Sequence, residues 1–326
     1  MGPNITGGSS GGRLRVDATT ALPTTGTVAI STGGRLTLNA TGTYGGTNQA
    51  LTFNPNQTAN PALDILSGAA VTWQGTVAIN ADTRIEANGS NGTLTFSGSV
   101  AGSGTLIKQG SGDLILSGTG NALTGATTIS AGTVNAAAAG ALGNTPSITV
   151  NTGGTLLLSG TGNRINDSAS LTLAGGTFNL GGNAGNETLG TLTLSGNSAI
   201  DFGTLGTATT LRFADSSSTT WGNFTLKIYD WEGNPFTGGG RDQLFFGSGN
   251  SGLTSAQLSK ITFYPGDGTS TPYSPPSGFA PVAGVSIGEV APVPEPSAVV
   301  ACLSLLGLAA YRERRHLGFG SRVARS

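Results

Sequence analysis

The chain has 326 residues, of which Asp, Glu, Lys and Arg make up 10%, and its formal net charge is −1. This balance gives no electrostatic basis for binding nucleic acid or an anionic membrane surface, and it leaves few side chains for acid–base chemistry. The single cysteine, Cys302, excludes an intramolecular disulfide and a zinc site of the cysteine type.

Residues 1–215 return repeatedly to one pattern, a short apolar–polar alternation followed by glycine. The clearest copies are residues 93–98, 105–110, 113–118, 127–132, 155–160, 170–175 and 191–196. Alternation with period two places Leu, Ile, Val and Phe on one face of a strand and Thr, Ser and Asn on the other. The glycine that follows permits a turn with positive φ, which strains other residues. The pattern predicts an all-β region.

The self-similarity of these strands favours a solenoid, in which each coil stacks its apolar residues on the coil below. The spacing between strands is too short for crossover helices. An antiparallel sandwich built from similar strands is the alternative that the spacing leaves open.

One segment, residues 102–144, has a more specific pattern of Gly, Leu, Lys and Asn positions. The positions that carry it are Leu106, Lys108, Gly110, Gly112, Leu114, Leu116, Gly118, Asn121, Thr124, Gly125, Gly132, Ala141, Leu142 and Gly143. This segment resembles the autotransporter-associated β-strand repeat. The resemblance implies that residues 1–215 form a right-handed parallel β-helix, the passenger of an exported surface protein.

Residues 216–290 differ from residues 1–215 in composition, because large aromatic residues and then prolines appear in them. Trp221 and Trp231 stand within strand-like alternation and are expected to plug the end of the solenoid, although a carbohydrate-stacking surface is a second interpretation. Thr254 and Gln257 have the spacing of a helix capping box, which predicts one short helix before a strand at 261–263. The Pro-rich residues 264–282, together with 291–293, are expected to be a spacer.

The chain closes on an apolar run followed by arginines. Residues 298–310 are apolar apart from Ser304, and Arg312, Arg314 and Arg315 end the run. A membrane-spanning helix normally needs about 20 residues, so this run is short. Arginines at one end retain that end on the cytoplasmic side, and their long side chains reach the membrane interface. We expect a transmembrane helix over 298–311 with a basic cluster at 312–315.

The order of three elements, Val293-Pro294-Glu295-Pro296-Ser297, an apolar helix and a basic cluster, resembles the PEP-CTERM sorting signal, here residues 291–315. The same tail also resembles an ice-binding-protein C-terminal segment. The resemblance implies export, transient retention in the inner membrane and cleavage near the motif by an exosortase-type transpeptidase, with transfer to the cell surface. Residues 293–297 would be the sorting motif, with Glu295 and its two prolines as the element that the enzyme recognises. An extracellular polysaccharide is a further expected partner.

Two features depart from that family. Residues 316–326 continue beyond the basic cluster, whereas the family tail usually ends there. The first twenty residues also lack a charged segment followed by an apolar one, so no secretion signal is visible. We therefore expect the sequence to be a fragment whose signal peptide and further coils lie upstream.

Three functions are compatible with a β-helix, and the sequence supports them to different degrees. A structural or adhesive surface role agrees with the repeat, the low charge and the tail. A polysaccharide lyase or glycoside hydrolase needs convergent catalytic groups, but His316 lies in the tail and the acids are dispersed, with Asp201, Asp215, Asp230 and Asp242 as the candidates to converge. An ice- or surface-binding module needs a regular Thr-x-Thr array, and pairs such as Thr93–Thr95 do not recur in every coil. We expect no catalytic residues, metal or cofactor.

Overall fold

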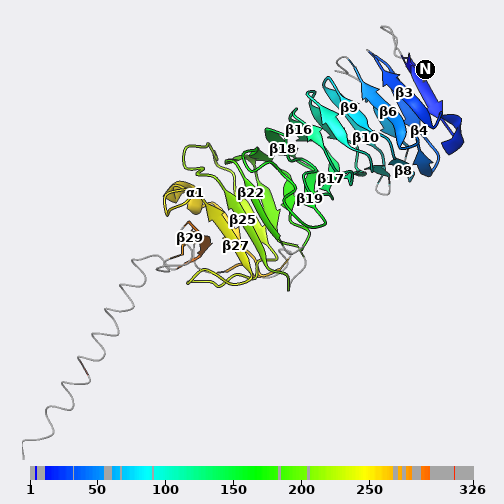
Figure 1. The fold of residues 1–326 in the computed structure, drawn as a ribbon. Helices are drawn as coiled ribbons and strands as arrows, with labels where there is room; N and C mark the ends of the chain where they lie inside the picture. The colour runs from blue at the N-terminus through cyan, green and yellow to red at the C-terminus, as the bar shows by residue number, and fades with distance from the viewer. Residues whose placement is uncertain are drawn as a thin grey trace, which may run out of the picture.

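The structure is a computed structural model that describes residues 4–5, 12–31, 33–54, 61–66, 68–89, 92–182, 185–203, 206–266, 271–273, 277–280, 288–293 and 312. These residues form an elongated right-handed parallel β-solenoid of about eight turns. The coils stack from the N-terminal end toward a wider C-terminal end that carries a short helix and a hairpin (Figure 1). The prediction of a parallel β-helix is confirmed, and the antiparallel sandwich is wrong.

Four parallel sheets form the walls of the solenoid. The nine-stranded sheet contains β2 (Arg13–Val16), β4 (Arg35–Leu38), β7 (Leu63–Ile65), β10 (Thr83–Ala87), β13 (Leu106–Gln109), β16 (Thr127–Ile129), β18 (Ser147–Asn151), β20 (Ser170–Ala174) and β23 (Leu192–Gly196). The ten-stranded sheet contains β5 (Gly42–Tyr44), β8 (Ala70–Trp73), β11 (Thr93–Phe96), β14 (Asp113–Leu116), β17 (Gly132–Ala136), β19 (Gly154–Leu158), β21 (Thr177–Asn179), β24 (Ser198–Asp201), β26 (Leu226–Tyr229) and β28 (Ile261–Phe263).

The third wall changes along the solenoid. Its first part is the six-stranded sheet, with β1 (Asn4–Ile5), β3 (Thr25–Ile30), β6 (Asn48–Phe53), β9 (Val77–Ile79), β12 (Val100–Gly102) and β15 (Ala122–Leu123). The three-stranded sheet comes later in the chain and contains β22 (Gly185–Leu189), β25 (Thr209–Phe213) and β27 (Asp242–Phe246). The remaining elements are the 3-10 helix η1 (Thr19–Ala21), the helix α1 (Ser255–Leu258) and the antiparallel hairpin of β29 (Ser277–Phe279) and β30 (Val290–Pro292).

The core is a stack of in-register apolar side chains. On the ten-stranded sheet, Leu94 pairs with Leu114 and Leu114 with Val134, so a coil here takes 20 residues. All three side chains are fully buried. Burying one such side chain stabilises the fold by about 1.5–3 kcal/mol. The alternation seen in the sequence therefore positions the core, while the outward residues are left for the surface.

Several positions of the repeat-like segment have distinct structural roles. Lys108 points inward between Ile85 and Ile129, and its Nζ donates to the carbonyl oxygens of Gln109, Gly110 and Ala131 at 2.8, 2.8 and 3.2 Å. The buried ammonium group thus holds two successive turns together.

Asn121 and Gly125 shape the turns before and after β15 in the same coil. The Asn121 side chain accepts the N–H of Val100 and donates to the carbonyl of Gly118. A Cβ on Gly125 would lie 1.9 Å from the carbonyl oxygen of Gly104 in the coil below. Only glycine permits this close stacking of the backbone, which explains why glycine recurs at the corners.

A buried ion pair lies where the third wall resumes. The carboxylate of Glu187 on β22 accepts the backbone N–H groups of Arg164 and Ile165, and the Arg164 Nε donates to it at 3.1 Å. Burial raises the pKa of Glu187, while these hydrogen bonds and the arginine oppose the shift. The side chain thereby satisfies backbone donors on the preceding coil, which forms no strand at 164–165.

The C-terminal end of the solenoid is filled by aromatic side chains. Trp221 and Trp231 are 2% and 1% exposed. The Trp221 ring packs edge-on against Phe246, and the Trp231 ring lies 4.7 Å from Phe263 between centroids. Thr254 is the N-cap of helix α1, and its side chain and that of Gln257 form the predicted capping box. The aromatic cap is confirmed, and the carbohydrate-stacking interpretation of the two tryptophans is wrong because both are buried.

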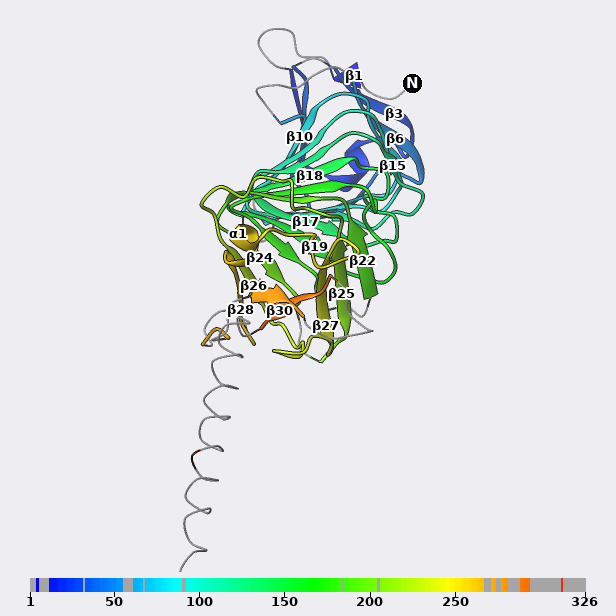
Figure 2. The same cartoon turned by 90° about the vertical axis from the view of Figure 1, so that its left-hand side faces the viewer.

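The residues after the cap close the open edges of the last coil. Glu289 pairs antiparallel with Phe245 at the edge strand β27, and Tyr273 donates its N–H to the carbonyl of Phe263 on β28. Strand β30 lies across the end of the solenoid, between β28 and β27 (Figure 2). Val290 and Ala291 are fully buried. The described part of the expected spacer is therefore packed on the cap, where it shields edges that would otherwise pair with other chains.

Candidate functional site

The predicted sorting motif begins where the described fold ends. Val293 directly follows β30 and packs, partly buried, against the core. Pro294, Glu295, Pro296 and Ser297 lie outside the described residues, as do Arg314, Arg315 and the predicted helix over 298–311. Arg312 is described and exposed. Within the ranges given above, no helix has the length and apolar character needed to cross a membrane.

The four aspartates proposed to converge lie in different surroundings. Asp201 is on β24, where its carboxylate accepts from Asn179 Nδ2 and the Gly203 N–H. Asp215 is exposed and accepts from Ser217. Asp230 follows β26 at a φ of 51°, and Asp242 is buried on β27. Among the described residues, no group of three His, Cys, Asp or Glu is arranged to hold a metal ion.

A column of threonines runs along the outer face of the nine-stranded sheet. Thr128, Thr149, Thr172 and Thr193 stand in register on four successive strands. Sequence inspection missed this column because it looked for Thr-x-Thr pairs within a strand. The positions two residues earlier are Ala126, Ser147, Ser170 and Thr191, so the column does not widen into a Thr-x-Thr array.

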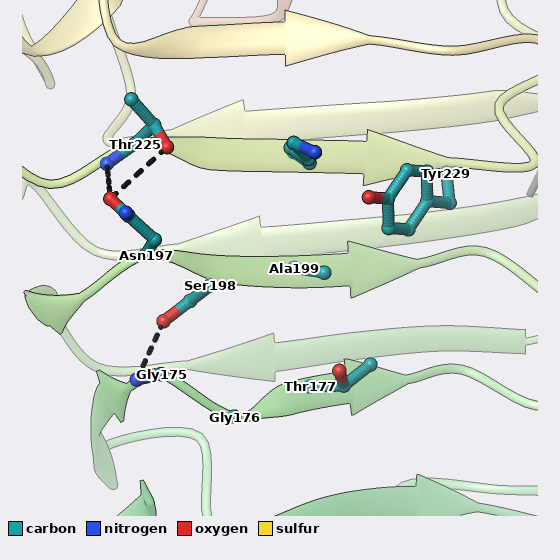
Figure 3. A pocket seen from close by; sticks show the side chains of 9 residues that line it. Gly175, Gly176, Thr177, Asn197, Ser198, Ala199, Thr225 and Tyr229 are labelled. Atoms are coloured by element: carbon teal, nitrogen blue, oxygen red, sulfur yellow. Dashed lines mark hydrogen bonds between the residues drawn. The ribbon is translucent and has the colours of Figure 1, made fainter. Parts of the chain in front are cut away.

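The outer face of the ten-stranded sheet has a hollow of about 270 Å³ close to the cap. Three successive strands contribute to its floor, where Thr177, Ala199 and Lys227 stand in register on β21, β24 and β26. Because Ala199 has the smallest of these three side chains, the sheet surface is depressed at Ala199, between Thr177 and Lys227. Figure 3 shows Thr177 and Ala199 on adjacent strands, with the ring of Tyr229 at one end and Asn197 and Thr225 at the other.

Local hydrogen bonds fix the polar end of the hollow. The Asn197 Oδ1 accepts the N–H and the hydroxyl of Thr225, at 3.0 and 3.2 Å. Ser198 accepts the Gly175 N–H at 3.0 Å (Figure 3). Gly175 has a φ of 96°, and a Cβ there would lie 2.3 Å from Thr152 Oγ1, so the chain needs glycine at this corner. The corner residues are thereby held in one arrangement before any ligand arrives.

An aromatic pair and a cation form the other end. The Tyr229 and Tyr264 rings lie 5.3 Å apart between centroids with an interplanar angle of 51°, and Lys227 Nζ lies 5.8 Å from the Tyr264 centroid. In Figure 3 the Tyr229 hydroxyl is directed back along the strands toward the polar end. The sequence analysis named none of these residues as a site. Their juxtaposition arises from register between coils of different lengths, since Ala199 precedes Lys227 by 28 residues.

Comparison with known proteins identifies one short region of similarity. A family model described as the passenger-associated-transport-repeat matches residues 106–136. This segment resembles a passenger repeat. It covers β13 to β17, which is the coil that contains Lys108 and Asn121 together with part of the next coil. No curated protein and no solved structure matches the chain. The repeat and the solenoid together fit a surface-exposed passenger of the autotransporter type.

Proposed function

We propose that the protein is an exported bacterial surface protein whose solenoid serves as a structural or adhesive passenger. The observation that carries this proposal is the match of a passenger repeat to residues 106–136, within a continuous parallel solenoid. A rod of stacked coils places a long outer surface away from its point of attachment. The dispersed aspartates favour a non-catalytic role.

The finer part of the proposal is sorting through residues 291–315. Its support is the order of the Pro-Glu-Pro motif, the apolar run and the arginines. An exosortase-type transpeptidase would read Pro294, Glu295 and Pro296, and the helix over 298–311 would hold the chain in the inner membrane until cleavage. The buried strand β30 ends directly before this motif, so the folded cap would stand close to the membrane during processing.

Fractionation of the producing cells tests the proposal. The unaltered chain is expected at the cell surface in a shortened form. A Glu295→Ala variant is expected to accumulate at full length in membranes, because the recognition element is damaged. The control Asp215→Ala removes an exposed carboxylate outside residues 291–315 and is expected to be processed normally. Equal processing of Glu295→Ala and the unaltered chain would contradict the sorting proposal.

A further inference from the structure

The hollow beside the cap combines three kinds of group that recognise a sugar. An aromatic ring offers an apolar face with a polar tip, and Tyr229 provides both at one end. Hydroxyl and amide groups, from Thr177, Thr225 and Asn197, suit the hydroxyl edge of a sugar ring. The volume, about 270 Å³, is near the roughly 300 Å³ lower end of small-molecule pockets. A monosaccharide-sized unit of a longer chain fits this size, and the open outer face leaves room for the chain to continue.

The polar groups retain capacity for a ligand. Asn197 uses its Oδ1 on Thr225, and no hydrogen bond occupies its amide nitrogen within the described residues. Asn197 is an exposed residue that lines the hollow, and its amide nitrogen supplies two donors. Because Oδ1 is bound to the neighbouring coil, the amide orientation is set in advance, which lowers the entropy lost on binding.

The charge at the hollow is positive. Lys227 is exposed and forms no ion pair with any carboxylate in the described part of the chain. Asp201 stands in register with Tyr229 but does not line the hollow, and its oxygens accept hydrogen bonds from Asn179 and Gly203. The contact of Lys227 with the Tyr264 ring, at 5.8 Å, is a weak one that leaves the ammonium group available. A ligand with an anionic group is therefore favoured over a neutral one.

We propose that this hollow binds an acidic saccharide, with the sugar ring against Tyr229, its anionic group on Lys227 and its hydroxyls on Asn197 and Thr177. A carboxylate of a uronic acid and a sulfate ester share the chemistry that Lys227 recognises. This inference rests on the proposed surface role, since it names the ligand class through which the passenger adheres. The site is distinct from the buried tryptophans, which do not reach the surface.

Titration calorimetry on the whole chain tests the inference with matched pairs of probes. One pair is tetragalacturonate and its neutral methyl ester, and the other is a sulfated dextran oligosaccharide and its unsulfated parent. Each charged member is expected to bind about tenfold or more tightly than its neutral partner, as one charge-assisted hydrogen bond would give. If only one of the two charged probes is preferred over its neutral partner, that probe identifies carboxylate or sulfate as the natural anionic group. A preference for either charged probe supports the inference.

Variants separate the hollow from the rest of the surface. Lys227→Met is expected to abolish the preference for the charged probe over its neutral partner. Tyr229→Ala is expected to weaken the binding of both probes of a pair. Ala199→Leu is expected to prevent binding, because the larger side chain fills the floor of the hollow. Two control variants are expected to leave the binding of all probes unchanged. Arg15→Met removes an exposed cation near the N-terminal end, and Thr155→Leu enlarges a side chain two coils before Ala199 in the same outward column. Equal binding of charged and neutral probes, undiminished binding by Ala199→Leu, or no binding of any probe at millimolar concentration would overturn the inference. A Lys227→Met chain that still reaches the cell surface would show that the proposed function stands independently.

Discussion

The carboxylate of Glu289 accepts the backbone N–H of Gly239, fifty residues earlier in the chain, with both oxygens 2.9 Å from the nitrogen. Gln243 Nε2 donates to the same carboxylate at 3.3 Å. Glu289 is fully buried and lies just before β30. This one side chain therefore joins the loop before β27 to the segment that leads into the predicted sorting motif.

We predict that Glu289→Ala loosens the end of the cap. The Gly239 donor and the Gln243 amide lose their acceptor, which should lower the free energy of unfolding by about 1–3 kcal/mol. Protease cleavage within 271–293 should become faster, as measured by peptide mapping. The control is Ser277→Ala, on the hairpin strand β29, which removes a single hydrogen bond to the carbonyl of Ile261 on β28 and should have a smaller effect. Equal cleavage rates in the two variants would contradict the role given to Glu289.

Lys108→Met tests the buried ammonium group of the repeat. Burial lowers the pKa of Lys108 to about 8, against the attraction of Asp113 and Glu86. Methionine keeps the apolar stem but leaves three carbonyls without their donor, so we expect destabilisation of about 1–3 kcal/mol in urea unfolding. Lys227→Met, at an exposed lysine, should change stability by less than about 0.5 kcal/mol. A more stable Lys108→Met chain would show that the cost of burying the charge exceeds the gain from its hydrogen bonds.

Asp242 should make the cap less stable as the pH rises from about 4 to about 6. Burial raises the pKa of this carboxyl to about 6. The hydrogen bond from the Glu232 N–H acts against this rise in pKa, and the negative charge of Glu232 adds to it. The folded state therefore holds a proton that the unfolded state releases at lower pH, and stability falls until the folded carboxyl also ionises. Asp242→Asn remains neutral, so its advantage over the unaltered chain should grow by about 2 kcal/mol between pH 4 and pH 7.

The matched control for that pH dependence is Asp215→Asn. Hydrogen bonds from Ser217 lower the pKa of Asp215, so its contribution has the opposite sign and is lost as the pH falls through the folded pKa. Urea midpoints of the three proteins at pH 4, 5, 6 and 7 provide the comparison. If Asp242→Asn and the unaltered chain have parallel pH profiles, the raised pKa is refuted.

Trp221→Ala should destabilise the cap by about 3–5 kcal/mol, because a buried indole that also donates to the Leu192 carbonyl is lost. Phe224→Ala, at a neighbouring exposed ring, should stay within about 0.5 kcal/mol of the unaltered chain. Thermal unfolding followed by near-ultraviolet circular dichroism measures both. Similar effects of the two substitutions would contradict a plug in which Trp221 is central.

Much of the fold could be predicted from the sequence because period-two alternation and corner glycines act locally. The strand Leu192–Gly196, the capping box at Thr254 and the aromatic plug all follow from patterns within a few residues. Glu187 and Glu289 could not be predicted in this way. An isolated glutamate normally suggests a solvated surface position, and only the register between coils shows that each satisfies backbone donors inside the structure.

The hollow could not be predicted from the sequence either, because it depends on the register between coils. Ala199, Lys227 and Tyr264 are ordinary strand or loop residues in sequence, and coil lengths that change near the cap obscure their alignment. The spacer expected at 291–293 was also misjudged. Ala291 is fully buried and, together with Val290 directly before the expected spacer, helps to close the last coil.

The most direct test of the account is the mass of the mature chain recovered from the cell surface. We predict that peptide mapping finds Val293 in this material and none of the residues from 298 onward, because a transpeptidase cuts near Pro294–Pro296. Recovery of a full-length chain ending at Ser326, from the cytosol and absent from the surface, would contradict the proposed export and sorting.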